Sequence, residues 1–190
     1  MESPLDAKIP FCEYFIIPYY LWFAYVPLTI GYFFFTSKKE FYQCTSFLFI
    51  GMTVCLITYT IWSNVILFRP NLDTLDRDNI FIRLTSIIYH VDTGANACPS
   101  IHCFNSIGLF IAIIKSEKLK RHKIIQWSSF ILSTSICLST LFVKQHSIID
   151  VFWAFILAAL MYLLVYDPDY QKIFENFRTE KSSKETTVEK

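Results

Sequence analysis

The stretch Lys144-Gln145-His146-Ser147-Ile148-Ile149-Asp150 separates two long apolar runs, Ile124–Val143 and Val151–Tyr166. Ionisable side chains beside membrane-length segments are costly, and they often mark a site that binds or reacts. If the stretch is helical, His146 and Asp150 lie on one face, four residues apart and within reach of each other. A carboxylate that fixes the tautomer of an imidazole makes it a better base or nucleophile. The alternative is that the polar residues only extend to the membrane surface.

The composition is that of a helical membrane protein. The chain has 190 residues, of which 54% are hydrophobic and 17% are charged, and its mean hydropathy is +0.40. Ordinary soluble domains carry about 25% charged residues. The apolar residues come in runs of membrane length, which indicates transmembrane helices. The net charge of +1 provides no basic field, so a nucleic-acid partner is not expected.

We expect an all-α membrane bundle of about five transmembrane helices. The expected spans are Glu13–Thr36, Cys44–Phe68, Ser100–Ile114, Ile124–Val143 and Ile148–Tyr166. Within the connection Asn71–Cys98, apolar residues recur at helical spacing from Ile80 to Val91, which predicts a short helix along the membrane surface. Residues 1–166 would form one membrane domain, and the polar tail 167–190 is expected to be disordered toward its end.

The basic residues predict the orientation of the bundle. Of 17 Lys and Arg residues, two follow the first expected span, five lie in the loop Lys115–Lys123 and five lie in the tail after Asp167. The positive-inside rule places this face, and with it the C-terminus, in the cytoplasm. The opposite, extracytoplasmic face then carries six polar residues at span ends: Arg69, Ser100, His102, Lys144, His146 and Asp150.

Such a group of residues suits a phosphate. Helix N-termini offer free N–H groups and a positive dipole end to anions. Arg69 would bind phosphate oxygens through its planar fork and Lys144 as a point charge. Two simpler interpretations remain open, since Arg69 can be an interface anchor and Ser100 only a helix cap.

The two histidines suggest phosphoryl transfer. His146, oriented by Asp150, would attack phosphorus and carry the phosphoryl group, and His102 would protonate the leaving alkoxide. Water would then release phosphate from His146, while the cations stabilise charge on the phosphoryl oxygens. Because side chains supply these charges, neither a metal ion nor a cofactor is expected.

Three short motifs in this order resemble those of the type 2 phosphatidic acid phosphatase superfamily. They are Arg69-Pro70, Pro99-Ser100-Ile101-His102, and His146 followed by Asp150, and the likeness covers roughly Trp62–Tyr166. Nearby, Tyr89-His90-Val91-Asp92 and Asn96 look like a bacterial branch of the family, which implies a bacterial cell membrane.

The resemblance implies roles for these residues. His146 is similar to the family nucleophile, Asp150 to its orienting acid and His102 to its leaving-group acid. Phosphate binding is implied for three more positions, which are Arg69, Ser100 and the backbone N–H of Ile101. Trp62 stands where the family usually has Lys, and Ser139-Thr140 stands where it usually has Ser-Arg, so Lys144 is expected to replace one missing cation.

The expected function is therefore that of an integral membrane lipid-phosphate phosphatase. The substrate would be a lipid phosphate monoester or diphosphate, with its apolar tail between helices and its headgroup at the extracytoplasmic rim. One alternative is a lipid phosphotransferase, similar to phosphosphingolipid or phosphoinositol synthases, which passes the group to an alcohol. A second alternative is a non-enzymatic protein that binds lipid headgroups, since two cations of the family pattern are absent.

Overall fold

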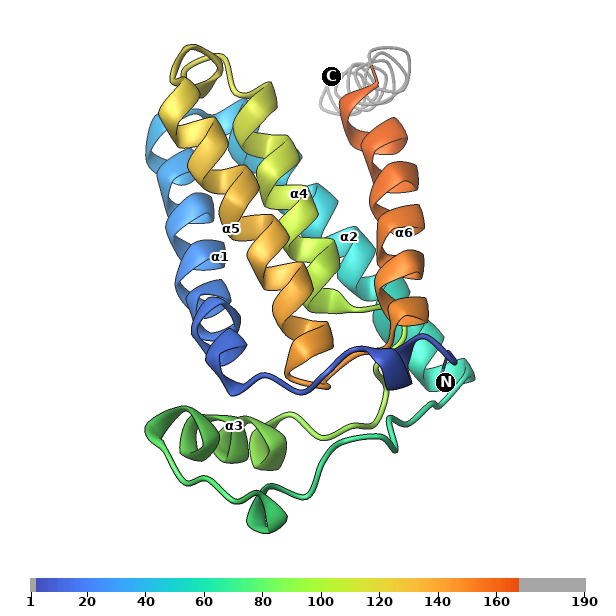
Figure 1. The fold of residues 1–190 in the computed structure, drawn as a ribbon. Helices are drawn as coiled ribbons and strands as arrows, with labels where there is room; N and C mark the ends of the chain where they lie inside the picture. The colour runs from blue at the N-terminus through green and yellow to red at the C-terminus, as the bar shows by residue number, and fades with distance from the viewer. Residues whose placement is uncertain (1–2, 168–190) are drawn as a thin grey trace, which may run out of the picture.

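The computed structural model describes residues 3–167, and its named secondary-structure elements in that range are all helices (Figure 1). The expected tail 167–190 lies almost entirely outside the described residues. Within them, the only β pairing is an isolated bridge between Val65 and Ala95. The α-helices are α1 (Ile16–Thr36), α2 (Lys38–Ile61), α3 (Ile80–Val91), α4 (Ile101–Lys115), α5 (Lys123–Phe142) and α6 (Ile148–Tyr166).

Four helices are long and apolar enough to cross a membrane, namely α1 with the 3-10 turn that precedes it, α2, α5 and α6. Helix α4 has 15 residues. At 1.5 Å per residue it is about 22 Å long, shorter than the roughly 30 Å hydrocarbon core. The expected all-helical fold is thus confirmed, and four of its helices are long and apolar enough to span a membrane, while a fifth span through α4 stays a prediction.

The boundary expected at the end of the second span was wrong. The apolar run continues to Phe68, but α2 ends at Ile61. The residues after it are extended because they pair with a second loop: Ile66 N donates to Gly94 O at 2.7 Å, and Asn96 N donates to Asn64 O at 2.6 Å. Apolar character alone does not distinguish this extended segment from another helical turn.

Helix α4 lies at the centre of the bundle and packs against α1, α2, α5 and α6 (Figure 1). Its fully buried Phe104 stacks on Phe47 of α2, with ring centroids 5.2 Å apart. Two glycines permit this contact: a Cβ added at Gly51 would lie 1.9 Å from Phe104 Cζ, and one at Gly108 would lie 2.4 Å from Phe47 Cε1. At the centre of the bundle, each of these two aromatic rings therefore packs directly against a glycine of the other helix.

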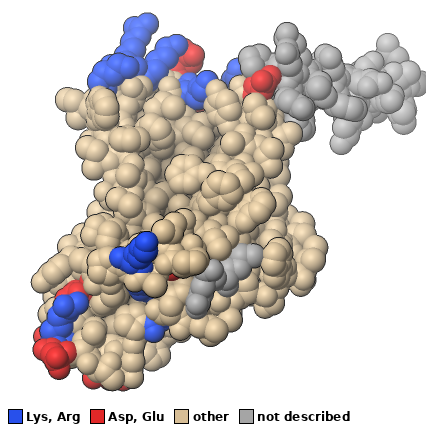
Figure 2. Space-filling view, turned by 45° about the vertical axis from the view of Figure 1, so that its right-hand side comes forward, with Lys and Arg blue, Asp and Glu red and all other residues tan. Residues whose placement is uncertain are grey.

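The outer surface of the bundle is apolar between two charged ends. Large apolar side chains on its helices are open to the surroundings, such as Leu28 at 72% and Phe35 at 85% exposure. Figure 2 shows Lys and Arg gathered toward the ends of the molecule, with a broad band free of charged side chains between them. Such a belt is what a lipid bilayer requires of an integral membrane protein.

One end of the bundle is closed by α3 and by the N-terminal segment (Figure 1). Helix α3 has the expected bounds, and Asn79 caps it by accepting from Phe81 N and Ile82 N. Tyr89 on α3 donates to Val143 O at 2.7 Å, which ties the helix to the end of α5. The N-termini of α4 and α6 lie at this same end, so the predicted site residues meet beneath α3.

Candidate active site

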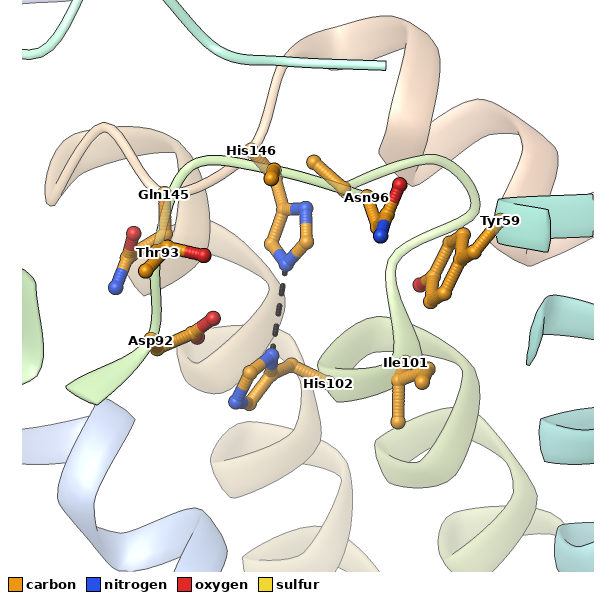
Figure 3. A pocket seen from close by; sticks show the side chains of 10 residues that line it. Tyr59, Asp92, Thr93, Asn96, Ile101, His102, Gln145 and His146 are labelled. Carbon is orange, nitrogen blue, oxygen red and sulfur yellow. Dashed lines mark hydrogen bonds between the residues drawn. The ribbon is translucent and has the colours of Figure 1, made fainter. Parts of the chain in front are cut away.

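A small cavity lies at the end of the bundle that α3 covers. Its volume is about 140 Å³, and it is lined by Tyr59, Asp92, Thr93, Ala95, Asn96, Ala97, Ile101, His102, Gln145 and His146 (Figure 3). Cavities that hold drug-sized ligands measure about 300–1,000 Å³. This one has room for a headgroup such as a phosphate ester, whereas a lipid chain would have to lie outside it.

The two predicted catalytic histidines face each other in this cavity. Nε2 of His146 lies 3.5 Å from Nδ1 of His102, although 44 residues separate them in the chain. Figure 3 shows the two rings pointing toward one another, with Gln145, Thr93 and Asp92 on one side and Asn96 and Tyr59 on the other. An atom bonded to His146 Nε2 would therefore have His102 beside it.

The His102 ring is held by two aromatic side chains of α1. Its centroid lies 4.7 Å from that of Tyr19 and 4.4 Å from that of Trp22. Tyr19 itself is anchored, because its hydroxyl donates to Asp92 Oδ2 at 2.7 Å. Helix α1, which carries none of the predicted site residues, thus fixes the orientation of one imidazole.

Asp150 faces the other nitrogen of His146. Its Oδ2 lies 3.5 Å from His146 Nδ1, and the carboxylate is fully buried. The same Oδ2 accepts from Ser147 N at 2.8 Å, while Ser147 Oγ accepts from Asp150 N at 3.3 Å. This reciprocal pair is a capping box at the start of α6.

His146 and Asp150 are close to each other for a different reason from the one expected. The sequence suggested two residues on one face of a helix, but His146 lies in the turn immediately before the cap residue Ser147. A helix cap followed three residues later by an acid brings the carboxylate back to the entry of the helix. The histidine at the preceding position then lies beside that carboxylate.

The N-termini of α4 and α6 are joined directly. Ser100 N donates to the backbone carbonyl of Asp150 at 3.2 Å, and Ser100 Oγ caps α4 by accepting from Cys103 N at 3.3 Å. Ser100 therefore acts as a cap, as one interpretation of the sequence allowed, and it is fully buried. Ile101, the first residue of α4, lines the cavity, and a backbone N–H at this position has no partner within its own helix.

Arg69 does not line the cavity. Its Nη2 donates to Asp92 O at 3.1 Å and to Gln145 Oε1, and its guanidinium lies over the Tyr89 ring, 4.6 Å from the centroid. Burial lowers the pKa of this guanidinium from its usual range, although the neighbouring Tyr89 and Asp92 act in the opposite direction. Arg69 is thus not part of the cavity lining, but it binds two residues that are, Asp92 and Gln145.

Lys144 is placed elsewhere. Its Nζ donates to the carbonyls of Asp6 at 2.7 Å and Ile9 at 2.5 Å, and it lies 5.4 Å from the centre of the Phe68 ring. It does not line the cavity. A phosphate contact would require its release from both carbonyls, so in this arrangement Lys144 binds the N-terminal segment. Trp62, which stands where the resemblance led us to expect Lys, is exposed just after the end of α2.

Sequence reasoning missed two cavity residues that the structure places beside the histidines. Gln145 lines the cavity and is 2% exposed, and no hydrogen-bond partner of its buried Nε2 is present among the described residues. Asp92 contributes a carboxylate to the lining. Gln145 stands next to His146 in the chain, and that adjacency was the one available signal. In the sequence, Asp92 was noted only as part of the stretch Tyr89-His90-Val91-Asp92 that carries the resemblance, and nothing indicated that it lines the site.

The ten lining residues include no Lys or Arg. Within residues 3–167, no group of three or more His, Cys, Asp and Glu side chains is placed to hold a metal ion. Comparison of the chain with protein-family models, with curated proteins and with solved structures found no match. The chemistry of the site is therefore inferred from the geometry of its own residues.

Proposed function

We propose that this protein is an integral membrane lipid-phosphate phosphatase that hydrolyses a phosphate monoester or diphosphate of a lipid through a phosphohistidine at His146. The observation that supports it best is the line Asp150–His146–His102. Oδ2 of Asp150 lies 3.5 Å from Nδ1 of His146, and Nδ1 of His102 lies 3.5 Å from Nε2 of the same imidazole. This line joins an orienting carboxylate, a nucleophile and a proton donor beside one cavity.

The reaction takes two steps. In the first, the Nε2 lone pair of His146 forms a bond to phosphorus, the P–O bond to the lipid breaks, and His102 gives its proton to the leaving alkoxide. In the second, water attacks phosphorus, the N–P bond breaks and the water proton passes to His102. Asp150 stabilises the charge that develops on His146 through its Nδ1–H.

The remaining cavity residues would bind the phosphoryl oxygens. The Nε2 amide group of Gln145 would act as a neutral donor to the phosphoryl group, while its Oε1 accepts from Arg69. The backbone N–H at the start of α4 adds the positive end of a helix dipole. These groups supply the charge stabilisation that the sequence assigned to the two cations.

We also propose that the site faces the extracytoplasmic side. The basic loop between α4 and α5 lies at the opposite end of the bundle from α3 and the N-termini of α4 and α6 (Figure 1). A cytoplasmic location for that loop, which the positive-inside rule favours, puts the cavity at the outer surface. A lipid substrate could then keep its chains in the bilayer and extend only its headgroup into the cavity.

Phosphate release tests the proposal. The purified protein in detergent, given phosphatidic acid and no acceptor alcohol, should release inorganic phosphate. His146→Ala should reduce the rate by at least about 1,000-fold, whereas His122→Ala, a histidine exposed in the basic loop, should leave it unchanged. Equal rates for His146→Ala and the unaltered protein would rule out the mechanism, and no turnover of any lipid phosphate would favour a headgroup-binding protein.

A lipid phosphotransferase is the second candidate, and Asp92 favours it. A carboxylate at a cavity without a lining Lys or Arg repels the dianion of a phosphate monoester more strongly than the single charge of a phosphodiester. The carboxylate could also accept a hydrogen bond from the hydroxyl of a headgroup or an acceptor alcohol. A strict requirement for an acceptor alcohol in the release assay would support this candidate over hydrolysis.

A further inference from the structure

The N-terminal segment crosses the end of the bundle that carries the cavity (Figure 1). Two of its acidic residues are almost completely buried, Asp6 at 3% exposure and Glu13 at 2%. Buried carboxylates need hydrogen-bond or charge partners. Glu13 finds them outside the site, in Arg77 at 2.8 Å and Asn79 at 3.2 Å, whereas Asp6 finds them around the loop that carries His146.

Asp6 holds that loop on both sides of the histidine. Before His146, Lys144 Nζ donates to the Asp6 carbonyl at 2.7 Å. After it, the backbone N–H of Ile148 donates to Asp6 Oδ1 at 2.9 Å, which places the carboxylate at the first residue of α6. Its second oxygen accepts from Ser3 N at 2.7 Å. One residue near the start of the chain, 138 and 142 positions from these two partners, thus binds both ends of the turn Lys144–Ser147.

This turn needs external support. Lys144 has a φ of 59°, a left-handed conformation that a non-glycine residue adopts at a cost. Inside the turn, the N–H groups of Gln145 and His146 both donate to one carbonyl, that of Thr140, at 2.9 and 3.0 Å. Thr140 of α5 therefore binds the backbone of His146 directly, and Asp6 binds the residues at the two ends of the turn.

We propose that Asp6 is a positioning residue for His146, which keeps its imidazole aligned between Asp150 and His102. The proposal rests on the phosphoryl-transfer function described above. If the carboxylate is lost, the N–H of Ile148 loses its partner and the start of α6 loses a favourable negative charge. The turn can then move, and a displacement of about 1 Å of a reacting group lowers a rate by about 100-fold.

Three variants separate positioning from general stability. Asp6→Ala should lower kcat for lipid phosphate by at least about tenfold and change KM less than kcat, because the start of α4 stays in place while the turn that carries His146 and Gln145 moves. Asp6→Asn retains an oxygen that can accept from Ile148, so it should recover most of the loss. Asp78→Ala removes an exposed carboxylate from the same end of the molecule, whose ion-pair partner within residues 3–167 is Arg83, and it should have no effect.

The rate of chemical modification of His146 measures how firmly the turn is held, and it does not depend on catalytic activity. His146 is 7% exposed, so diethyl pyrocarbonate should modify it slowly in the unaltered protein. Peptide mass spectrometry should show faster modification of His146 in Asp6→Ala and an unchanged rate at the exposed His122. Thermal unfolding of each variant in detergent identifies any that does not fold. If Asp6→Ala does not fold, Asp6→Asn provides the test, because it keeps the acceptor for Ile148 but lacks the negative charge, and it should show a smaller fall in kcat and a smaller rise in the modification rate of His146; no change in either would overturn the proposal.

The two proposals fail in different ways. If His146→Ala keeps full turnover, the phosphohistidine mechanism is wrong, and the modification rates still decide whether Asp6 holds the turn. If His146→Ala is inactive while Asp6→Ala matches the unaltered protein in both kcat and modification rate, Asp6 has no positioning role.

Discussion

The backbone N–H of Ser100 donates to the carbonyl of Asp150, 3.2 Å away, and this one bond joins the starts of the two helices that carry the candidate chemistry. His102 follows Ser100 by two residues, and His146 precedes Asp150 by four. The bond therefore fixes the separation of the imidazoles from the backbone, with Nε2 of His146 3.5 Å from Nδ1 of His102. The loss of any one member of this arrangement should alter the reaction in its own way.

Removal of His102 should slow hydrolysis more for substrates whose leaving group is more basic. Because His102 supplies the proton to the departing oxygen, His102→Ala should slow hydrolysis of an alkyl lipid phosphate by about 100-fold or more. A p-nitrophenyl phosphate ester, whose leaving group needs no proton, should lose much less. Steady-state rates on both substrates measure the ratio, and equal losses on the two would contradict an acid role for His102.

Asp150 has two roles that different substitutions separate. Asp150→Asn keeps an oxygen that can accept from Ser147 N, so the capping box and the melting temperature should be nearly preserved while turnover falls. Asp150→Ala should lose turnover and also about 1 kcal/mol of stability through the missing cap. Thermal unfolding and phosphate release on the same preparations test this. An active Asp150→Asn protein would show that the carboxylate is only a cap.

Asp92 should determine the charge of the preferred substrate. Asp92→Asn keeps an acceptor for the Tyr19 hydroxyl and removes one negative charge from the cavity wall. We expect kcat/KM for a phosphate monoester to rise by about tenfold relative to that for a phosphodiester, which corresponds to about 1.4 kcal/mol. Competition assays with paired lipids measure the ratio. An unchanged ratio would mean that the carboxylate does not face the phosphate.

The packing at the centre of the bundle depends on Gly51. An added methyl group would overlap the ring of Phe104, which is fully buried and stacked on Phe47, so Gly51→Ala should cost about 1–3 kcal/mol. Gly31→Ala is the matched control, because a Cβ added at Gly31 would meet no atom within 4 Å. Melting temperatures in one detergent compare the two. A Gly51→Ala protein as stable as the control would contradict the close contact with Phe104.

Helix bounds were predicted well where apolar runs and polar boundaries coincide. The expected bounds of α6 and α3 match the structure, and those of α5 differ by one residue at each end. The error at the end of α2 arose because the next segment is apolar and extended. Its conformation is set by hydrogen bonds to residues 94–98, a contact between distant segments that periodicity does not report.

The site was predictable to the extent that it depends on helix ends. His102, His146 and Asp150 meet because each lies at or near the start of a helix at the same end of the bundle. Lys144 was harder to place, since its position next to the His146 turn indicated the cavity, whereas its ammonium binds carbonyls of Asp6 and Ile9. A side chain in a turn can point to either side of it. The direction of Lys144 is set by two carbonyl partners that lie 138 and 135 residues away in the chain.

The central claim is that His146 carries the phosphoryl group. The protein should be mixed with a ³²P-labelled lipid phosphate, quenched in alkali within milliseconds and digested, because phosphohistidine survives alkali and is lost in acid. We predict an alkali-stable, acid-labile label on the peptide that contains His146, formed faster than turnover and absent from His146→Ala. Label on another residue, or turnover with no labelled peptide at any time, would contradict the account.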